Sequence, residues 1–317
     1  MAHPSRPVII DCDPGQDDAV MLFMALASPE QLNVLGITTV AGNVPLHLTQ
    51  RNARLICEWA GREDVPVYAG CDRPLARDLL TAEQVHGIEG IDGAPVREPV
   101  KPLENAHAVQ FICETLERSP EDSLTLVPTG PLTNIGQVLR DRPDLATRIR
   151  EIVLMGGAMR EGGNMSPSAE FNILVDPHAA EIVFGCGRPI TVAPLDVSHQ
   201  VIVTRGVLDA LREMTSPVAK ACLGMLEFFN RHDVAKYGTE GAPLHDPCTI
   251  AWLLRPELFR GKMCNVEIEC VSELTMGHTA VDFWGVTGRA PNARWLHEVD
   301  AEGFFDFLLE IVARYET

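Results

Sequence analysis

The chain has 317 residues, of which 46% are hydrophobic and 22% are charged, and its formal net charge is −18 at pH 7. This composition is that of a globular protein long enough to bury a substantial core, and it excludes a disordered chain or a fibrous repeat. The acidic excess disfavours a nucleic-acid polymer or an anionic membrane as partner, so a small neutral or cationic ligand is expected instead.

Neither a membrane span nor a disulfide framework is expected. The longest uninterrupted apolar stretch, residues 19–27, is much shorter than the ~20 residues that cross a bilayer, and no basic segment followed by an apolar one marks an export signal. Nine cysteines are scattered without a C-x-x-C pair, which favours reduced thiols. We therefore expect a cytoplasmic protein.

The predicted elements alternate between strands and helices through most of the chain. Runs rich in β-branched residues predict strands at residues 7–12, 33–39, 65–68, 123–127, 151–155 and 189–193. Segments of helical periodicity lie between them, at residues 17–28, 46–60, 105–118, 131–140 and 177–184. Beyond about residue 205 the pattern is mainly helical, with a strand pair near 263–271 and 278–284 and a final helix near 303–315.

This alternation predicts an α/β fold: an open, mostly parallel sheet flanked by helices, with a Rossmann-like core and a more helical C-terminal part. No linker or low-complexity tract interrupts the sequence, so we expect residues 1–317 to form one domain. Ligands of such sheets bind beyond the carboxyl ends of the strands. The polar residues that follow the predicted strands, and that we expect to meet there, are Asp11, Asp13, Asp17, Asp18, Asn43, His86, Thr129, Asn164, Glu170 and Asn172.

The segment from Asp11 to Asp18 carries four carboxylates in eight residues at a predicted strand-to-helix turn. Two carboxylates about 4 Å apart repel by roughly 4 kcal/mol at an effective dielectric constant near 20, so the group must take up protons or bind a cation. Because only oxygen ligands are offered, calcium or magnesium is favoured over zinc. An EF-hand is excluded, since it needs glycine and glutamate where Gln16 and Leu22 stand, and the glycine-rich phosphate-binding loops are absent.

Several of these residues also suit purely structural roles. Asp17 and Asp246 stand at the starts of predicted helices, where a carboxylate caps the N-terminus. Asn43 follows a glycine and suits a turn, and His86, in a glycine-containing loop, suits an exposed position. His245, beside a carboxylate, has a side chain that titrates close to neutral pH and is able to protonate a leaving group.

Together the motifs resemble the calcium-dependent nucleoside hydrolases of inosine-uridine type. The likeness rests on residues 11–19 (Asp-Cys-Asp-Pro-Gly-Gln-Asp-Asp-Ala), 129–134 (Thr-Gly-Pro-Leu-Thr-Asn), 169–172 (Ala-Glu-Phe-Asn) and 245–247 (His-Asp-Pro). It extends in order over nearly the whole chain. It implies the nucleoside hydrolase fold and hydrolysis of the N-glycosidic bond of ribonucleosides to free base and ribose. Gln16, where relatives are often apolar, and Ser166, where threonine is common, depart from the pattern without removing a ligand.

The resemblance also implies a role for each motif residue. Asp13, Asp18 and Asp246 would bind calcium together with the backbone carbonyl of Thr129, and Asp13 would also be the general base that activates a calcium-bound water. The ribose hydroxyls would be held by Asp17, Asn43, Asn164, Glu170 and Asn172. Asp11 would only orient its neighbours.

The base side of the site is expected to involve two histidines. The resemblance implies that His86 and His245 flank the base, with His245 as general acid, and that Phe171 lines the substrate site. Tyr237 either stacks on the planar base or packs internally. The segments from about residue 75 to 102 and from about residue 228 to 241 are expected to close over the base.

The expected substrate is a small-molecule ribonucleoside used in salvage. The presence of His245 favours pyrimidine or inosine and uridine substrates, and the resemblance suggests a homodimer or homotetramer. Two alternatives stay open: a hydrolase of another ribosylated metabolite, and a non-catalytic nucleoside- or calcium-binding protein. The second is disfavoured because Asp13 and His245 are both present.

Overall fold

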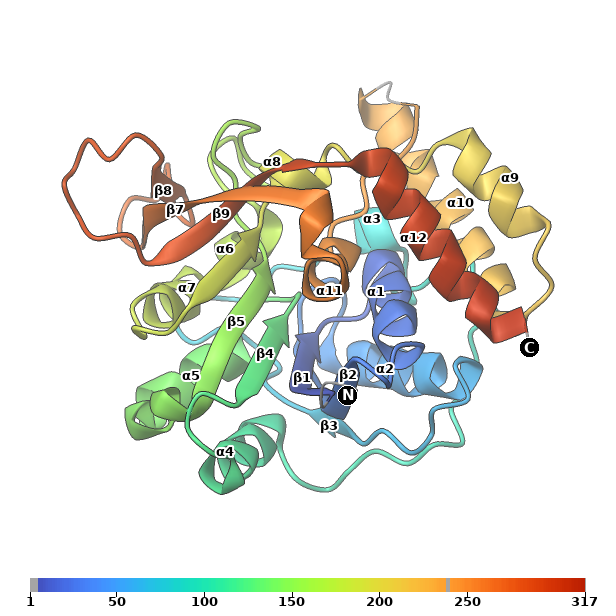
Figure 1. The fold of residues 1–317 in the computed structure, drawn as a ribbon, viewed down its shortest axis with the longest axis horizontal. Coiled ribbons are helices and arrows are strands. Elements are labelled where there is room, and N and C mark those ends of the chain that lie inside the picture. Colours follow the sequence, from blue (N-terminus) through green and yellow to red (C-terminus); the bar gives the residue numbers. More distant parts are fainter. Residues whose placement is uncertain (1–4, 238–239, 317) are drawn as a thin grey trace.

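Parallel strands rich in buried apolar residues form the centre of the protein. The computed structural model describes residues 5–237 and 240–316, apart from the side chains of residues 232–237. The first six strands are β1 (Arg6–Cys12), β2 (Leu32–Thr39), β3 (Val67–Ala69), β4 (Leu124–Pro128), β5 (Ile149–Met155) and β6 (Ile190–Ala193). They pair in parallel in the order β3-β2-β1-β4-β5-β6 (Figure 1). The six predicted strands and the open, mostly parallel sheet are confirmed.

The strand order of the sheet reverses at β1. The chain adds β2 and β3 on one side of β1 and then returns to add β4 on the other side. Ligands of open α/β sheets bind at such a switch point, beyond the carboxyl ends of the two central strands. Here Asp11 of β1 lies opposite Pro128 of β4, and the N–H of Thr129 donates to the carbonyl of Asp11 at 2.8 Å. The topology therefore brings the acidic segment beside the start of the 129–134 motif.

The other edge of the sheet is formed by three C-terminal strands. β7 (Phe259–Ile268) and β8 (Thr279–Asp282) are antiparallel, as the predicted strand pair requires. β9 (Ala293–Val299) is not among the predicted strands; it lies between β6 and β7, parallel to the first and antiparallel to the second. Its Trp295 is fully buried, so β9 completes the core on this side.

Helices flank the sheet. The predicted helices appear as α1 (Gln16–Leu26), α2 (Leu46–Trp59), α4 (Ala108–Arg118), α5 (Thr133–Asp141), α7 (Pro177–Phe184) and α12 (Ala301–Ala313). The others are α3 (Glu83–His86), α6 (Phe171–Val175), α8 (Leu195–Ser198), α9 (Arg205–Arg212), α10 (Pro217–Tyr237) and α11 (Pro247–Leu254). Within the described ranges, every helix is too short or too polar to cross a membrane.

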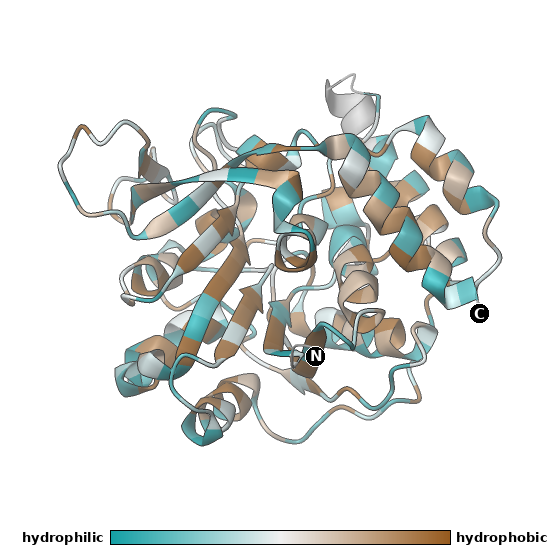
Figure 2. Cartoon of the chain, viewed as in Figure 1, coloured by the Kyte–Doolittle hydropathy of each residue, from teal (hydrophilic) through white to brown (hydrophobic). Residues whose placement is uncertain are grey.

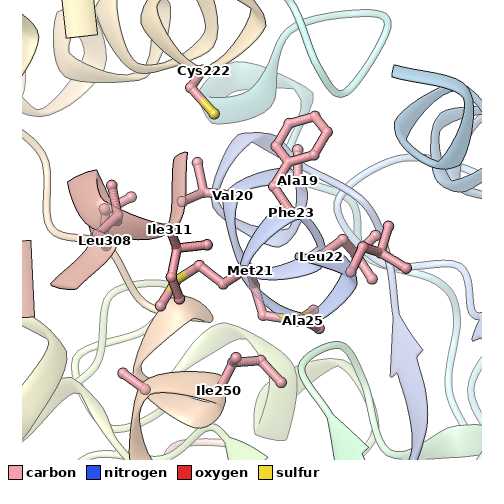
Figure 3. Packing of buried hydrophobic residues seen from close by; sticks show 14 of the residues in the cluster. Ala19, Val20, Met21, Leu22, Phe23, Ala25, Cys222, Ile250, Leu308 and Ile311 are labelled. Atoms are coloured by element: carbon pink, nitrogen blue, oxygen red, sulfur yellow. The ribbon is translucent and has the colours of Figure 1, made fainter. Parts of the chain in front are cut away.

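Helix α1 is buried on every side. All eleven of its residues are buried, because α10, α11 and α12 pack over the part that the sheet does not cover. Figure 3 shows side chains of α1 among Ile250 of α11, Leu308 and Ile311 of α12, and Cys222 of α10. Figure 2 shows hydrophobic residues in the central strands, whereas α12 at the surface alternates between hydrophobic and hydrophilic residues. A helix that is apolar on all faces is stable only in a core, and this packing fixes the position of its first turn.

Candidate active site

The first turn of α1 presents its carboxylates to the switch point of the sheet. Asp13 follows β1, and Asp17 and Asp18 lie in the first turn of α1. The backbone N–H of Gly15 donates to Asp18 Oδ2 at 2.9 Å, and the hydroxyl of Thr129 donates to Asp18 Oδ1 at 2.9 Å. Asp17 and Asp18 are 4% and 0% exposed, so solvent does not screen their charges.

Asp13 lies in a cradle of backbone that only glycine allows. The N–H of Asn43 donates to Asp13 Oδ2 at 2.7 Å, and the Asn43 amide donates to the carbonyl of Asp13 at 3.1 Å. A Cβ atom at Gly42 would clash with Asp13 Oδ2, and one at Gly130 would clash with Asp13 Oδ1. Asn43 is thus more than a turn residue, since it orients a buried carboxylate.

Asp246 joins this cluster from a distant part of the sequence. It stands at the start of α11, which packs beside α1 (Figure 1), but its side chain makes no capping hydrogen bond. One carboxylate oxygen from each of Asp17, Asp18 and Asp246 lies within 4.8 Å of the others. The capping interpretation therefore fails for Asp246, and the three side chains form a group able to hold a metal ion.

The electrostatics of the cluster favour either protonation of its carboxylates or a bound cation. Burial and the charge of Asp18 raise the pKa of Asp13 well above its usual range, and they raise the pKa of Asp17 to about 7. Burial, followed by the charge of Asp17, raises the pKa of Asp246. Asp13 Oδ1 and Asp17 Oδ1 are buried without a hydrogen-bond partner among the described residues. Oxygen-only donors with unsatisfied buried atoms fit a hard divalent cation.

The predicted metal ligands and the observed cluster overlap without being identical. The resemblance assigns Asp13 to the metal and Asp17 to the ribose, whereas the three carboxylates whose oxygens lie within 4.8 Å of one another are those of Asp17, Asp18 and Asp246. The carbonyl of Thr129, another predicted ligand, accepts a hydrogen bond of 2.7 Å from the Asn172 amide. These individual assignments stay predictions.

A second polar group, on the loop between β5 and α6, faces the carboxylates. Glu170 caps α6, where Oε1 accepts from the N–H of Asn172 at 2.9 Å and Oε2 accepts from Gly157 at 3.0 Å. Burial raises the pKa of Glu170 to about 7. Asn164 Oδ1 accepts from the N–H of Phe171 at 3.0 Å. Glu170 and Asn172 are therefore internal residues, not surface ones, at 2% and 5% exposure.

These groups border one cavity of about 510 Å³. The residues predicted from the sequence that line it are Asp17, Asp246, Thr129, Asn43, Asn164, Glu170, Phe171, Asn172, His86 and His245. A cavity of this size suits a small organic ligand. Of the other predicted residues, Asp13 and Asp18 are fully buried and do not line the cavity, and the side chain of Tyr237 is outside the described residues.

Two imidazoles, of His86 and His245, also line the cavity. His86, at the end of α3, is only 7% exposed, which excludes the exposed-loop interpretation, and its ring stacks on Phe229 with centroids 5.6 Å apart. The Nδ1 atom of His245 is hydrogen-bonded to the hydroxyl of Ser198 at 2.8 Å. Desolvation, with the nearby His199 and His86, lowers the pKa of His245 to about 3. Burial therefore disfavours the charged imidazolium form of His245.

Several residues of the cavity are not predicted by the sequence. The ring centroids of His199 and His245 are 5.8 Å apart, and His199 Nδ1 lies 3.1 Å from Glu161 Oε2. Both His199 and Glu161 line the cavity. Neither stands in a recognisable motif. Phe229 does fall in the segment 228–241 that is expected to close over the base, whereas Ile202 and Pro243, joined by an isolated β-bridge, carry no signal in the sequence.

Comparison with known proteins places this geometry in a family. Residues 8–306 match the family model described as inosine-uridine preferring nucleoside hydrolase. The chain is 48% identical over 312 residues to the pyrimidine-specific ribonucleoside hydrolase RihA of Shewanella sp. (strain MR-7), covering 98% of this chain and 97% of the relative. It is 45% identical over 307 residues to an uncharacterised protein of Schizosaccharomyces pombe, covering 97% and 99%.

Solved structures agree with the sequence relatives. The purine-preferring ribonucleoside hydrolase from Gardnerella vaginalis superposes with a TM-score of 0.91 at 30% identity, and the plant nucleoside hydrolase PpNRh1 with a TM-score of 0.90 at 31% identity. Each comparison covers 98% of this chain and 99% of the other. From its sequence motifs, its sheet topology and the extent of these matches, the chain belongs to the inosine-uridine preferring nucleoside hydrolase family.

Proposed function

We propose that this protein is a calcium-dependent hydrolase that cleaves the N-glycosidic bond of ribonucleosides to free base and ribose, with a preference for pyrimidine nucleosides. The observation that carries the proposal is the lining of one cavity. Buried carboxylates and amides line it together with imidazoles and Phe229. Cleavage through an oxocarbenium-like sugar needs an activated water and stabilised positive charge near the sugar, and assistance to the departing base.

The cation would be held by Asp13, Asp18, Asp246 and the carbonyl of Thr129. The oxygen-only donor set and the unsatisfied Asp13 Oδ1 support a hard ion such as calcium. When bound, calcium would lower the pKa of a water molecule and fix the ribose hydroxyls. Asp17 belongs to the same cluster and also lines the cavity, so it would bind a ribose hydroxyl beside the cation.

Asp13 is the proposed general base. Its Oδ2 is held by the N–H of Asn43, which leaves Oδ1 to take the proton of the attacking water. The new bond forms between that water and the anomeric carbon of the ribose as the bond to the base breaks. The neighbouring carboxylates would stabilise the positive charge that develops on the ring.

The ribose hydroxyls would be recognised by side chains whose positions are fixed by backbone hydrogen bonds. Glu170 is held by the N–H groups of Asn172, Gly157 and Ile173. Asn164 is held by the N–H of Phe171, and Asn43 by the acidic segment. Together with Asp17 and Asn172, they would bind the sugar with little loss of side-chain entropy at each turnover.

His245 is the proposed general acid for the leaving base. Because the N–H of a neutral imidazole is far too weak an acid, His245 would act as the imidazolium, donating Nδ1–H to the hydroxyl of Ser198 and Nε2–H to the departing base. Burial lowers the pKa of His245 to about 3, so the ring would take up this proton from solvent only as negative charge develops on the base. His86 would contact the base from the other side, stacked on Phe229. Phe171 lines the same cavity and would exclude water from the reacting bond.

Relatives named as pyrimidine-specific, at 48% identity over nearly the whole chain, support the substrate preference. The test is to incubate the purified protein with uridine, cytidine, inosine, adenosine and guanosine in the presence of calcium and to measure the reducing sugar released. We expect release from uridine and cytidine first. No release from any of the five would contradict the proposal and favour another ribosylated metabolite.

The proposal extends to the cellular setting. All nine cysteines are free, which supports a reducing compartment, and we propose a cytoplasmic role in nucleoside salvage. We also propose that the enzyme is a homodimer or homotetramer, which sedimentation of the purified protein would test.

A further inference from the structure

Thr279, the first residue of β8, hydrogen-bonds both backbone groups of one residue in the loop after β5. Its hydroxyl donates to the carbonyl of Ala158 at 2.6 Å and accepts from the N–H of Ala158 at 3.0 Å. The Thr279 side chain is buried, although β8 is the outermost strand on its side of the sheet (Figure 1). Thr279 does not line the cavity of the candidate active site, and none of the roles proposed above uses it.

The residue before Ala158 is one of those that hold Glu170. The N–H of Gly157 donates to Glu170 Oε2 at 3.0 Å, and the carbonyl of Gly157 accepts from the N–H of Leu195 at 2.9 Å. Gly157 has a φ of +80°, and a Cβ atom there would clash with the Thr279 methyl group. The peptide group between Gly157 and Ala158 is thus held at both ends, by Leu195 at its carbonyl and by Thr279 at its N–H.

The segment that leads into β8 also contacts the other end of this loop. His278 Nδ1 lies 3.1 Å from the carbonyl oxygen of Ser168, and a Cβ atom at Gly277 would clash with the backbone of Leu174. The loop between β5 and α6 therefore rests on residues 277–279 at its start and near its end. Since the Glu170 carboxylate accepts its hydrogen bonds from backbone N–H groups of this region, the position of the backbone decides where the carboxylate lies.

We propose that Thr279 is a positioning residue for ribose recognition, which fixes the Gly157–Ala158 peptide so that the Gly157 N–H holds Glu170 where it meets the sugar. The contact with ribose rests on the proposed function, whereas the hold on the loop rests on hydrogen bonds within the protein alone. A hydroxyl is the group required, because Ala158 needs both a donor and an acceptor from one side chain. Valine has nearly the shape of threonine but would leave the N–H and the carbonyl of buried Ala158 unpaired.

The hold on the loop is measured by hydrogen–deuterium exchange of single backbone amides in the calcium-loaded protein without substrate. Thr279→Val should speed exchange at Gly157 and Ala158 about 10-fold, whereas Thr279→Ser, which keeps the hydroxyl, should stay close to the wild type. Thr49→Val is the matched control, because buried Thr49 also donates to a backbone carbonyl, that of Leu46, and lies outside the cavity. It should leave both amides unchanged. Unchanged exchange at both amides in folded Thr279→Val would overturn the proposal, whether or not any nucleoside is hydrolysed.

A double-mutant cycle tests whether Thr279 acts through Glu170. The substrate is 4-nitrophenyl riboside, whose leaving group departs without a proton, so that slow variants stay measurable. Thr279→Val should lower kcat/KM about 10-fold in the wild-type background but less than about twofold in Glu170→Gln, where the positioned carboxylate is already lost. Thr279→Ser should restore most of the rate. The same loss in both backgrounds would indicate a general structural effect and would contradict the link to Glu170.

A second substrate separates the sugar from the base. Uridine and 4-nitrophenyl riboside share the ribose, so Thr279→Val should lower kcat/KM by the same factor on both. A loss confined to uridine would mean that Thr279 acts on the base side, which would contradict the proposal. If the wild-type protein hydrolyses neither substrate, the proposed function fails and the link to ribose fails with it, whereas hydrogen exchange still decides whether Thr279 fixes the loop.

Discussion

Removing the cation should make the stability of the protein fall as the pH rises. Burial and the charge of Asp18 raise the pKa of Asp17 from 3.8 to about 7, and burial raises the pKa of Glu170 from 4.5 to about 7. Between these values the folded, metal-free chain binds more protons than the unfolded chain. Each group therefore contributes fully to the stability of the metal-free folded state below its unfolded pKa, near 4. This contribution is lost as the pH rises through the folded pKa, about 7.

The expected size of the effect follows from the two shifts. Each pKa unit corresponds to about 1.4 kcal/mol, so ionisation costs the folded state about 4 kcal/mol at Asp17 and about 3 kcal/mol at Glu170. The free energy of unfolding of a whole domain is roughly 5–15 kcal/mol, so the stability lost by ionising these two carboxyl groups is a large part of it. A divalent cation binds the ionised carboxylates, and at a thousand times its Kd it adds about 4 kcal/mol. Calcium should therefore offset about half of the loss.

The assay is urea unfolding at about pH 5 and about pH 8, each in EGTA and in excess calcium. Fluorescence of the fully buried Trp295 should report the transition. In EGTA we expect a lower free energy of unfolding at the higher pH, and calcium should make this decrease clearly smaller. Asp18→Asn should remove most of the calcium effect, whereas Asp306→Asn, an exposed carboxylate on α12, should leave it intact. Equal stability at both pH values in EGTA would refute the electrostatic reasoning.

Three further predictions concern the reaction. Asp13→Asn should lower kcat for uridine by about 10²-fold or more, because the general base is lost, and undiminished steady-state hydrolysis would contradict this role. His245→Ala should slow uridine much more than 4-nitrophenyl riboside, whose leaving group needs no proton; an equal loss would argue against an acid role. The kcat/KM for 2′-deoxyuridine should be about 10⁴-fold lower than that for uridine, because the sugar-binding side chains, Glu170 among them, would be left without the 2′-hydroxyl as a partner. Comparable rates on the two substrates would exclude the assignment of these side chains to the 2′-hydroxyl.

The central fold is predictable from the sequence because its signals are local. The runs that form β1 to β6 are short, apolar and β-branched, and their predicted boundaries agree with the structure to within about two residues. β9 escapes prediction, since its identity as a strand depends on pairing with β6 and β7, far away in the sequence. Long-range pairing of this kind leaves little mark on local composition.

The candidate site is predictable where chemistry is concentrated in a motif. Four carboxylates in eight residues are enough to indicate a cation, and Asp246 stands in a short motif of its own. His199 and Glu161 are not predictable, because a lone histidine and a lone glutamate gain meaning only when the fold brings them together. The same is true of Thr279, whose partner Ala158 lies 121 positions earlier in the chain.

The role of Asp11 is clearer in the structure than in the sequence. The expectation is that it orients its neighbours, and its Oδ1 accepts hydrogen bonds from the Thr38 hydroxyl at 2.5 Å and the Asn134 amide at 2.8 Å. These contacts link β1 to β2 and to α5, next to the candidate cation site. They support a positioning role for Asp11 and explain why four carboxylates need not all bind one ion.

The most direct test of the whole account is a calcium titration of chelator-treated protein, in which binding is measured by calorimetry and uridine hydrolysis is measured on the same samples. We predict that one calcium ion binds per chain and that hydrolysis rises in proportion to the occupied fraction. Full hydrolysis in the chelated protein, or calcium binding that leaves the rate unchanged, would contradict the claim that the buried carboxylates act through a bound cation.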